Sequence, residues 1–135
     1  MNPLPFKLNT GTFGELFTQF RLLQFDVQAA APLKDTGNDL IAVRGEVFRA
    51  ISVRATTGRT FNKPNPQRLY HILAVVKFEK SEDGVVLDQT DLFLVPRAAV
   101  DAVQNNIPAV ARYRISKELV DKFFPKRANL IGRRR

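Results

Sequence analysis

Residues 38–57 read NDLIAVRGEVFRAISVRATT, and this stretch decides the fold class. The apolar run at 39–43 leads through the tight turn Arg44-Gly45-Glu46 into a β-rich run at 47–55, which predicts a β-hairpin. Neither run alternates cleanly between polar and apolar residues. We therefore expect both strands to lie inside a sheet, with both faces largely covered.

A helix is predicted before this hairpin, at residues 12–25. Its apolar residues recur at spacings of three and four, which places them on one helix face. They are Phe13, Leu16, Phe17, Phe20 and Leu23. Thr12 is a candidate N-cap, and Glu15 three residues later has the spacing of a capping box.

The rest of the chain also divides into strands and helices. Further strands are predicted at 27–33, 69–78, 85–95 and 111–115, and further helices at 97–104 and 117–124. Ser116 is the predicted cap of the last helix, and the polar stretch at 56–68 is a predicted loop. This order predicts the α/β or α+β class, with a mixed central β-sheet flanked by helices.

Composition limits the chemistry that the chain can perform. Its 135 residues suit one domain, which we place at 1–125, followed by a basic tail at 126–135. The absence of cysteine excludes disulfides, thiolate metal sites and cysteine nucleophiles. The single histidine, His71, is expected in the core or on a sheet face and is assigned no role.

No signal peptide or membrane span is evident in the sequence. Residues 1–7 lack a charged start followed by an apolar run, and no stretch approaches the roughly 18 apolar residues of a membrane helix. We therefore expect a cytoplasmic protein without a membrane partner.

The charge is strongly basic, with 21 Lys and Arg against 13 Asp and Glu, a net charge of +8. Nucleic acid is the natural partner of such a chain, and a merely solvated loop and tail is the alternative. The candidate nucleic-acid-binding residues are Arg49, Arg59, Lys63, Arg68, Arg133, Arg134 and Arg135.

Familiar enzyme motifs are missing. The sequence holds no glycine-rich loop followed by Lys-Ser/Thr, no Gly-x-Gly-x-x-Gly and no Gly-x-Ser-x-Gly. Nucleotide hydrolysis, dinucleotide redox chemistry and serine-hydrolase chemistry are therefore disfavoured.

Four segments together carry a resemblance to a known superfamily. They are Gly14-Glu15-Leu16, the run at 38–43, the run at 48–57 and the stretch at 92–96. Over about residues 11–96 the sequence resembles the PD-(D/E)XK nuclease superfamily, nearest to small members such as intron-encoded homing endonucleases and junction-resolvase-like proteins. The resemblance implies a restriction-endonuclease-like fold and a nucleic-acid partner, DNA rather than RNA.

The resemblance also implies a site. Glu15 and Asp39 match the carboxylates that help to hold a divalent metal, Mg²⁺ or Mn²⁺, in that superfamily. Ser52 stands at the position of the third acid and Arg54 at that of the lysine, so both depart from the pattern. Serine is a neutral, weak ligand, and arginine stays protonated and is bulkier than lysine. The site that is implied is therefore a weak or degenerate metal-dependent phosphodiesterase, and endonuclease activity stays open.

Several alternatives remain at this level. A lysine from elsewhere, Lys63 or Lys77, could replace the missing cation, or Glu46 could act from the hairpin turn. Structurally, Glu15 could be a capping residue, Asp39 a turn residue and Arg54 the ion-pair partner of either carboxylate. The alternative function is a non-enzymatic protein-interaction or regulatory module that retains the nuclease fold, as a homodimer through the hairpin at 69–95.

Overall fold

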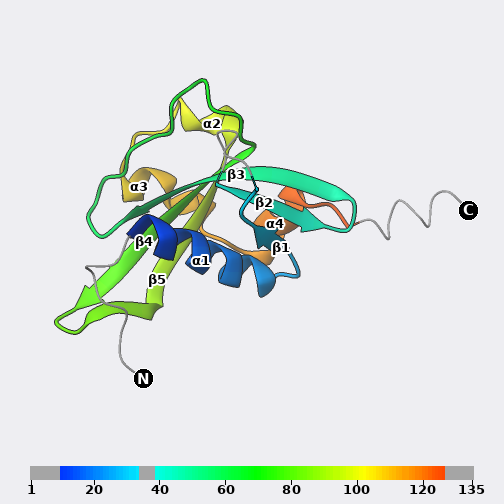
Figure 1. The fold of residues 1–135 in the computed structure, drawn as a ribbon. Helices are drawn as coiled ribbons and strands as arrows, with labels where there is room; N and C mark the ends of the chain where they lie inside the picture. The colour runs from blue at the N-terminus through cyan, green and yellow to red at the C-terminus, as the bar shows by residue number, and fades with distance from the viewer. Residues whose placement is uncertain (1–9, 34–38, 127–135) are drawn as a thin grey trace, which may run out of the picture.

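The structure is a computed structural model that describes residues 10–33 and 39–126 (Figure 1). In chain order the elements are α1 (Thr10–Leu23), β1 (Gln28–Ala30), β2 (Leu40–Arg44), β3 (Val47–Thr56), β4 (Ile72–Ser81), β5 (Gly84–Pro96), α2 (Arg97–Val100), α3 (Ile107–Val110), the 3-10 helix η1 (Ala111–Tyr113) and α4 (Lys117–Phe123). The predicted turn at 34–38 and the tail from 127 onward, with Arg133, Arg134 and Arg135, lie outside the described residues.

The five strands form one mixed sheet in the order β1-β2-β3-β4-β5. Strands β3 and β4 run parallel, and every other neighbouring pair is antiparallel. The two predicted hairpins, β2–β3 and β4–β5, are therefore confirmed, as is the mixed central sheet. The middle of β3, at Ile51–Val53, is buried as predicted.

The two faces of the sheet carry two separate apolar clusters. Ile51 and Val53 of β3 face α1 and belong to the larger cluster, which Val120 of α4 also joins. Ser52 and Arg54 pair with Leu73 and Val75 of β4, which belong to the second cluster under the loop at 57–71, α2 and α3. Since paired residues in a ladder share a face, Ser52 and Arg54 point away from α1.

Helix α1 forms as predicted, but its start and its buried face differ from the prediction. The helix already includes Thr10, so Thr12 lies inside it and the predicted capping box is wrong. The buried residues are Gly14, Phe17, Thr18 and Leu22, whereas Leu16, Phe20 and Leu23 are 56%, 58% and 59% exposed.

The close approach of Gly14 to β3 explains why the buried face of α1 differs from the predicted one. A Cβ atom at Gly14 would lie 2.9 Å from the Cβ of Ala55, so only glycine lets the helix backbone approach so closely. The hydroxyl of Thr18 is buried beside it and donates to the Gly14 carbonyl oxygen at 2.7 Å, which satisfies its polar group.

The C-terminal third departs most from the predictions. The strand predicted at 111–115 is wrong, because Ala111–Tyr113 forms a 3-10 helix and Arg114 makes only an isolated bridge to Phe93. The helix predicted at 97–104 ends at Val100, and the strand predicted at 27–33 covers only Gln28–Ala30. The cap of α4 is confirmed, since the hydroxyl oxygen of Ser116 accepts from the Leu119 amide at 3.1 Å.

Arg44, the last residue of β2, has a structural role. Its guanidinium donates to Asp121 Oδ1 at 2.7 Å, to the Phe124 carbonyl at 2.9 Å and to the Phe25 carbonyl at 2.7 Å. These bonds tie the ends of α1 and α4 to the end of β2. Lys117 also donates to Asp121 Oδ2 at 2.9 Å.

This arrangement gives a prediction of acid sensitivity. The hydrogen bonds from Lys117 and then Arg44 lower the pKa of Asp121 from 3.8 to about 2. A carboxyl with a depressed folded-state pKa stabilises the fold above its unfolded pKa and loses that contribution as pH falls through the folded one. We expect Asp121→Asn to melt at a lower temperature than wild type above about pH 4. The two melting temperatures should converge as the pH falls to about 2.

Thermal unfolding between pH 2 and pH 6, followed by circular dichroism, measures this difference. Asp83→Asn, at an exposed carboxylate in the β4–β5 turn, is the matched control and should leave the wild-type profile unchanged. An Asp121→Asn profile parallel to that of wild type over the whole range would contradict the prediction.

Candidate metal and phosphate site

Asp39 is fixed at the start of β2, against β3. Its amide donates to the Ile51 carbonyl at 2.9 Å, and its Oδ2 atom accepts from the Val53 amide at 2.7 Å. A carboxylate that accepts from a strand amide cannot rotate away from that strand. Asp39 is therefore held against the strand that carries Ser52 and Arg54.

Glu15 is brought to Asp39 by the close packing of α1 on β3. It follows Gly14, the residue that lies against Ala55. Burial, and then the negative charge of Asp39, raise the pKa of the Glu15 carboxyl above its ordinary value. Two carboxylates that repel each other in a partly buried place are the setting in which a bound cation is most stabilising.

Ser52 and Arg54 flank Val53 on β3, and each holds a buried polar atom without a partner. The Ser52 side chain is fully buried, and neither its Oγ atom nor the Nε atom of Arg54 makes a hydrogen bond within residues 10–33 and 39–126. In the part of the chain that the structure describes, Arg54 makes no ion pair with Glu15 or Asp39. The ion pair considered as a structural explanation of Arg54 is therefore absent.

Tyr70 and Arg97 lie close to Arg54, and sequence reasoning missed both. The guanidinium carbon of Arg97 lies 4.0 Å above the centre of the Tyr70 ring. Burial is the main cause that raises the pKa of Tyr70, Asp101 adds to it, and the positive charges of Arg97 and Arg54 oppose it. Arg54 thus lies within electrostatic reach of the Tyr70 hydroxyl.

Arg97 also anchors the loop at 57–71. It donates to the Arg68 carbonyl at 2.7 Å and to the Pro66 carbonyl at 2.5 Å. Phe61 and Tyr70 of the loop are buried in the second apolar cluster. The loop therefore packs on the sheet. Its aromatic residues are the feature of the sequence from which this packing could have been predicted.

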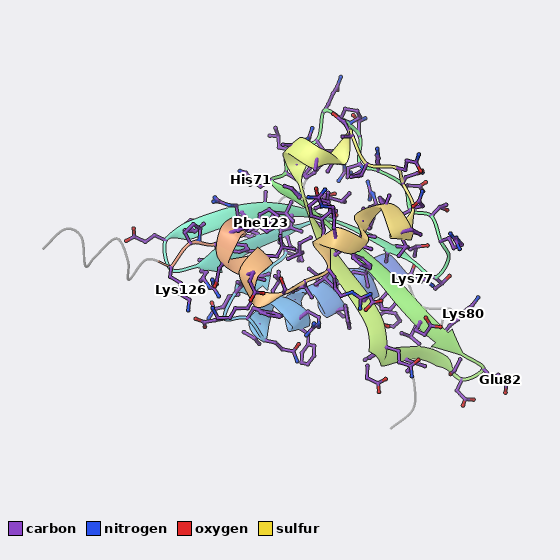
Figure 2. All side chains as sticks on the ribbon, turned by 180° about the vertical axis from the view of Figure 1, so that it is seen from behind. His71, Lys77, Lys80, Glu82, Phe123 and Lys126 are labelled. Atoms are coloured by element: carbon purple, nitrogen blue, oxygen red, sulfur yellow. The ribbon has the colours of Figure 1, made fainter. Side chains whose placement is uncertain are left out.

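The two lysines considered as alternative sources of a cation each donate to a backbone carbonyl. The ammonium of Lys63 donates to the Val103 carbonyl at 2.5 Å, and that of Lys77 to the Thr57 carbonyl at 2.8 Å (Figure 2). Glu46 lies in the turn at the far end of β2 from Asp39, roughly 20 Å away at the rise of a strand. The described contacts do not link the two lysines to Glu15 or Asp39, and these alternatives stay predictions.

The predicted nucleic-acid-binding residues do not form one continuous cluster. Arg59 is exposed and Arg68 half-buried, both in the loop at 57–71. Arg49 lies on β3 and donates from Nε to the Phe123 carbonyl at 3.0 Å, at the end of α4 (Figure 2).

His71 is exposed, so a place in the core is wrong (Figure 2). Its Nδ1 atom accepts from the Ala50 amide at 2.8 Å. This bond continues the β3–β4 pairing by one step before β4 begins.

Larger metal-binding clusters are absent from residues 10–33 and 39–126, where no three His, Cys, Asp or Glu side chains are grouped so that they could hold a metal ion. Among the same residues, no helix has the length and apolar character needed to span a membrane.

The fold belongs to a recognisable class, a mixed α+β domain similar to the fold of a homing endonuclease. The solved structure that shows this is the bacterial homing endonuclease I-Ssp6803I, which superposes with a TM-score of 0.62 over 98% of this chain and 99% of that chain, at 15% identity. No protein-family model and no curated protein matches the sequence. The predicted fold class is therefore confirmed.

Proposed function

We propose that this chain is a nucleic-acid-binding domain derived from PD-(D/E)XK nucleases, with DNA rather than RNA as its partner. Its metal-dependent phosphodiesterase site is weak or degenerate. The observation that carries the proposal is the Glu15–Asp39 pair, held against β3 by the Asp39–Val53 hydrogen bond of 2.7 Å. The likeness to a homing endonuclease supports it at the level of the fold.

The two carboxylates fit a hard divalent cation. Mg²⁺ binds through one or two carboxylates and keeps several of its waters, so Glu15 and the free oxygen of Asp39 are a sufficient donor set. Such a cation would relieve the repulsion that raises the pKa of Glu15. When bound, Mg²⁺ or Mn²⁺ supplies a Lewis acid for phosphodiester chemistry.

Arg54 provides the phosphate contact in this proposal. A buried guanidinium nitrogen without an acceptor is costly, and a phosphate oxygen is the acceptor that guanidinium groups bind best. The hydroxyl of Ser52, also without a partner, lies on the same strand face and can donate a second hydrogen bond. Arg54 stays protonated, so it holds a phosphate without taking a proton from water.

Further basic residues of the domain add affinity without sequence preference. Arg59 and Arg68 of the loop at 57–71, Arg49 on β3 and Lys63 are the described members of this set. The tail residues Arg133, Arg134 and Arg135, the division into a domain at 1–125 and a tail, and the cytoplasmic location stay predictions.

DNA binding is tested first, by fluorescence anisotropy of labelled duplex at several salt concentrations. We expect a steep fall in affinity with salt, and at least about tenfold weaker binding for Arg54→Gln. Arg112→Gln, at an exposed arginine of η1, is the matched control and should stay near wild type. A chain ending at Pro125 separates the tail from the domain.

Equal affinities for the Arg54→Gln and Arg112→Gln variants would remove Arg54 from the interface. Loss of all binding in the chain that ends at Pro125 would leave only an electrostatic tail. The alternative, a protein-interaction or regulatory module that retains the fold, would then be the function to pursue.

Metal binding is tested separately, by the rise in melting temperature on addition of Mn²⁺. A ligand that binds only the folded state stabilises it, so we expect a rise for wild type and none for Asp39→Asn. Slow cleavage of labelled linear and branched DNA with Mg²⁺ or Mn²⁺, where it occurs, should disappear in the same variant. An equal rise in both proteins would show that the cation binds elsewhere.

A further inference from the structure

We propose that the outer side of α1, together with Leu87 of β5, is the surface through which two copies of this chain associate. Leu16, Phe20 and Leu23 occupy one stripe of α1 and are 56%, 58% and 59% exposed. Leu87, on the neighbouring strand, is 46% exposed. The inference goes beyond nucleic-acid binding and does not depend on it.

The exposed side chains border a groove rather than standing alone. A hollow of about 600 Å³ lies between α1 and β5 and is lined by Phe17, Phe20 and Leu87, among others. A second hollow, of about 200 Å³, lies beside it under Leu16 and Phe20, with Phe78 on its wall. Figure 1 shows α1 lying in front of the upper parts of β4 and β5. Contiguous apolar surface of this kind marks an interaction site.

Charges on the two walls of the groove favour a second copy as its occupant. Arg21 lines the wall formed by α1, and Asp88 lines the wall formed by β5. An isologous dimer requires a patch that complements itself. With α1 of each copy over β5 of the other, Phe20 would enter the apolar groove and Arg21 would face the partner's Asp88.

The same features disfavour nucleic acid on this face. Asp88 and Asp91 line the groove and would repel a phosphate backbone, and Phe17, Phe20 and Leu87 add apolar surface to it. Asp91 is already paired with Arg114 at 3.0 Å, so Asp88 is the acid that we assign to the contact.

Sedimentation equilibrium of the full chain over a range of concentrations tests the proposal. Wild type is expected to dimerise, and Phe20→Asp to raise the dimer dissociation constant at least about 30-fold, as expected for the centre of an interface. Phe48→Asp is the matched control, because Phe48 is 59% exposed on β3, away from the groove. Circular dichroism establishes that both variants are folded.

A charge exchange tests the two-fold geometry. Arg21→Glu and Asp88→Lys should each dimerise more weakly than wild type, because each places like charges in contact. An equimolar mixture of the two should form a heterodimer, since one contact is then Glu–Lys and the other Arg–Asp. Native mass spectrometry distinguishes the three species.

A wild type that stays monomeric at all concentrations would overturn the proposal, as would equal effects of Phe20→Asp and Phe48→Asp. Absence of the heterodimer from the mixture would overturn the two-fold arrangement. DNA affinity measured on the Phe20→Asp variant keeps the two proposals apart. The contribution of Arg54 to DNA binding does not require the dimer contact.

Discussion

The double variant Ser52→Glu/Arg54→Lys is expected to cleave duplex DNA with Mg²⁺ at least about 100-fold faster than wild type. The glutamate adds a carboxylate on the strand that holds Asp39, which raises the affinity for a divalent cation. The lysine replaces a planar, permanently charged group by a compact ammonium. Both positions flank Val53, whose amide holds Asp39, so the new groups arise next to Asp39, on the face of β3 opposite α1.

Cleavage of a labelled duplex, measured under single-turnover conditions, gives the rate. Adding Asp39→Asn to the double variant is the control and should return the rate to background. Because Ser52 is fully buried, a charged side chain at this position is unfavourable. Ser52→Gln/Arg54→Lys therefore repeats the test with an uncharged side chain at position 52. Folded double variants that stay at background with both Mg²⁺ and Mn²⁺ would mean that Glu15 and Asp39 do not form a metal site.

Substitution of Gly14 by valine is expected to lower the free energy of unfolding by about 3 kcal/mol, a large overpacking effect. A Cβ at this position would lie 2.9 Å from the Cβ of Ala55 and 3.4 Å from Cγ1 of Val53, so α1 would have to move away from β3. The better helix propensity of a residue other than glycine, at most about 1 kcal/mol, does not offset this.

Urea denaturation measures the loss, and Gly58→Val provides the matched control. A Cβ at Gly58 would meet only the Thr56 hydroxyl at 3.8 Å, so this variant should stay within about 0.5 kcal/mol of wild type. We also expect Gly14→Val to abolish the Mn²⁺-dependent rise in melting temperature, because Glu15 moves with the helix. A stability equal to that of Gly58→Val would contradict the close contact of α1 with β3.

Local patterns in the sequence were sufficient for most of the sheet. The turn at Gly45, where φ is 62°, and the apolar runs on either side predicted the β2–β3 hairpin within one residue at each end. The hairpin β4–β5 and the cap at Ser116 followed from equally local signals. Residues 111–113 were predicted wrongly, because they have strand-like composition but continue the helical segment that Pro108 and the Asn106 cap begin at Ile107.

In the candidate site, the sequence was sufficient to select residues but not to show which of them lie close together. Glu15 and Asp39 were selected from the sequence, and their proximity is a property of the fold, because α1 must approach β3 at Gly14 before the two charges meet. The stacking of Arg97 on Tyr70 left no local signal, since 27 residues separate them in the chain.

The sequence by itself determined the strand order of each hairpin, the departures at Ser52 and Arg54, and the excess of positive charge, because turn chemistry, residue identity and formal charge are local properties. Only the tertiary structure decided which side of α1 is buried and that Arg44 holds the ends of two helices. It also decided that Lys63 and Lys77 are engaged on backbone carbonyls. Burial and hydrogen-bond partners depend on which distant segments pack together, and the periodicity of a single segment does not contain that information.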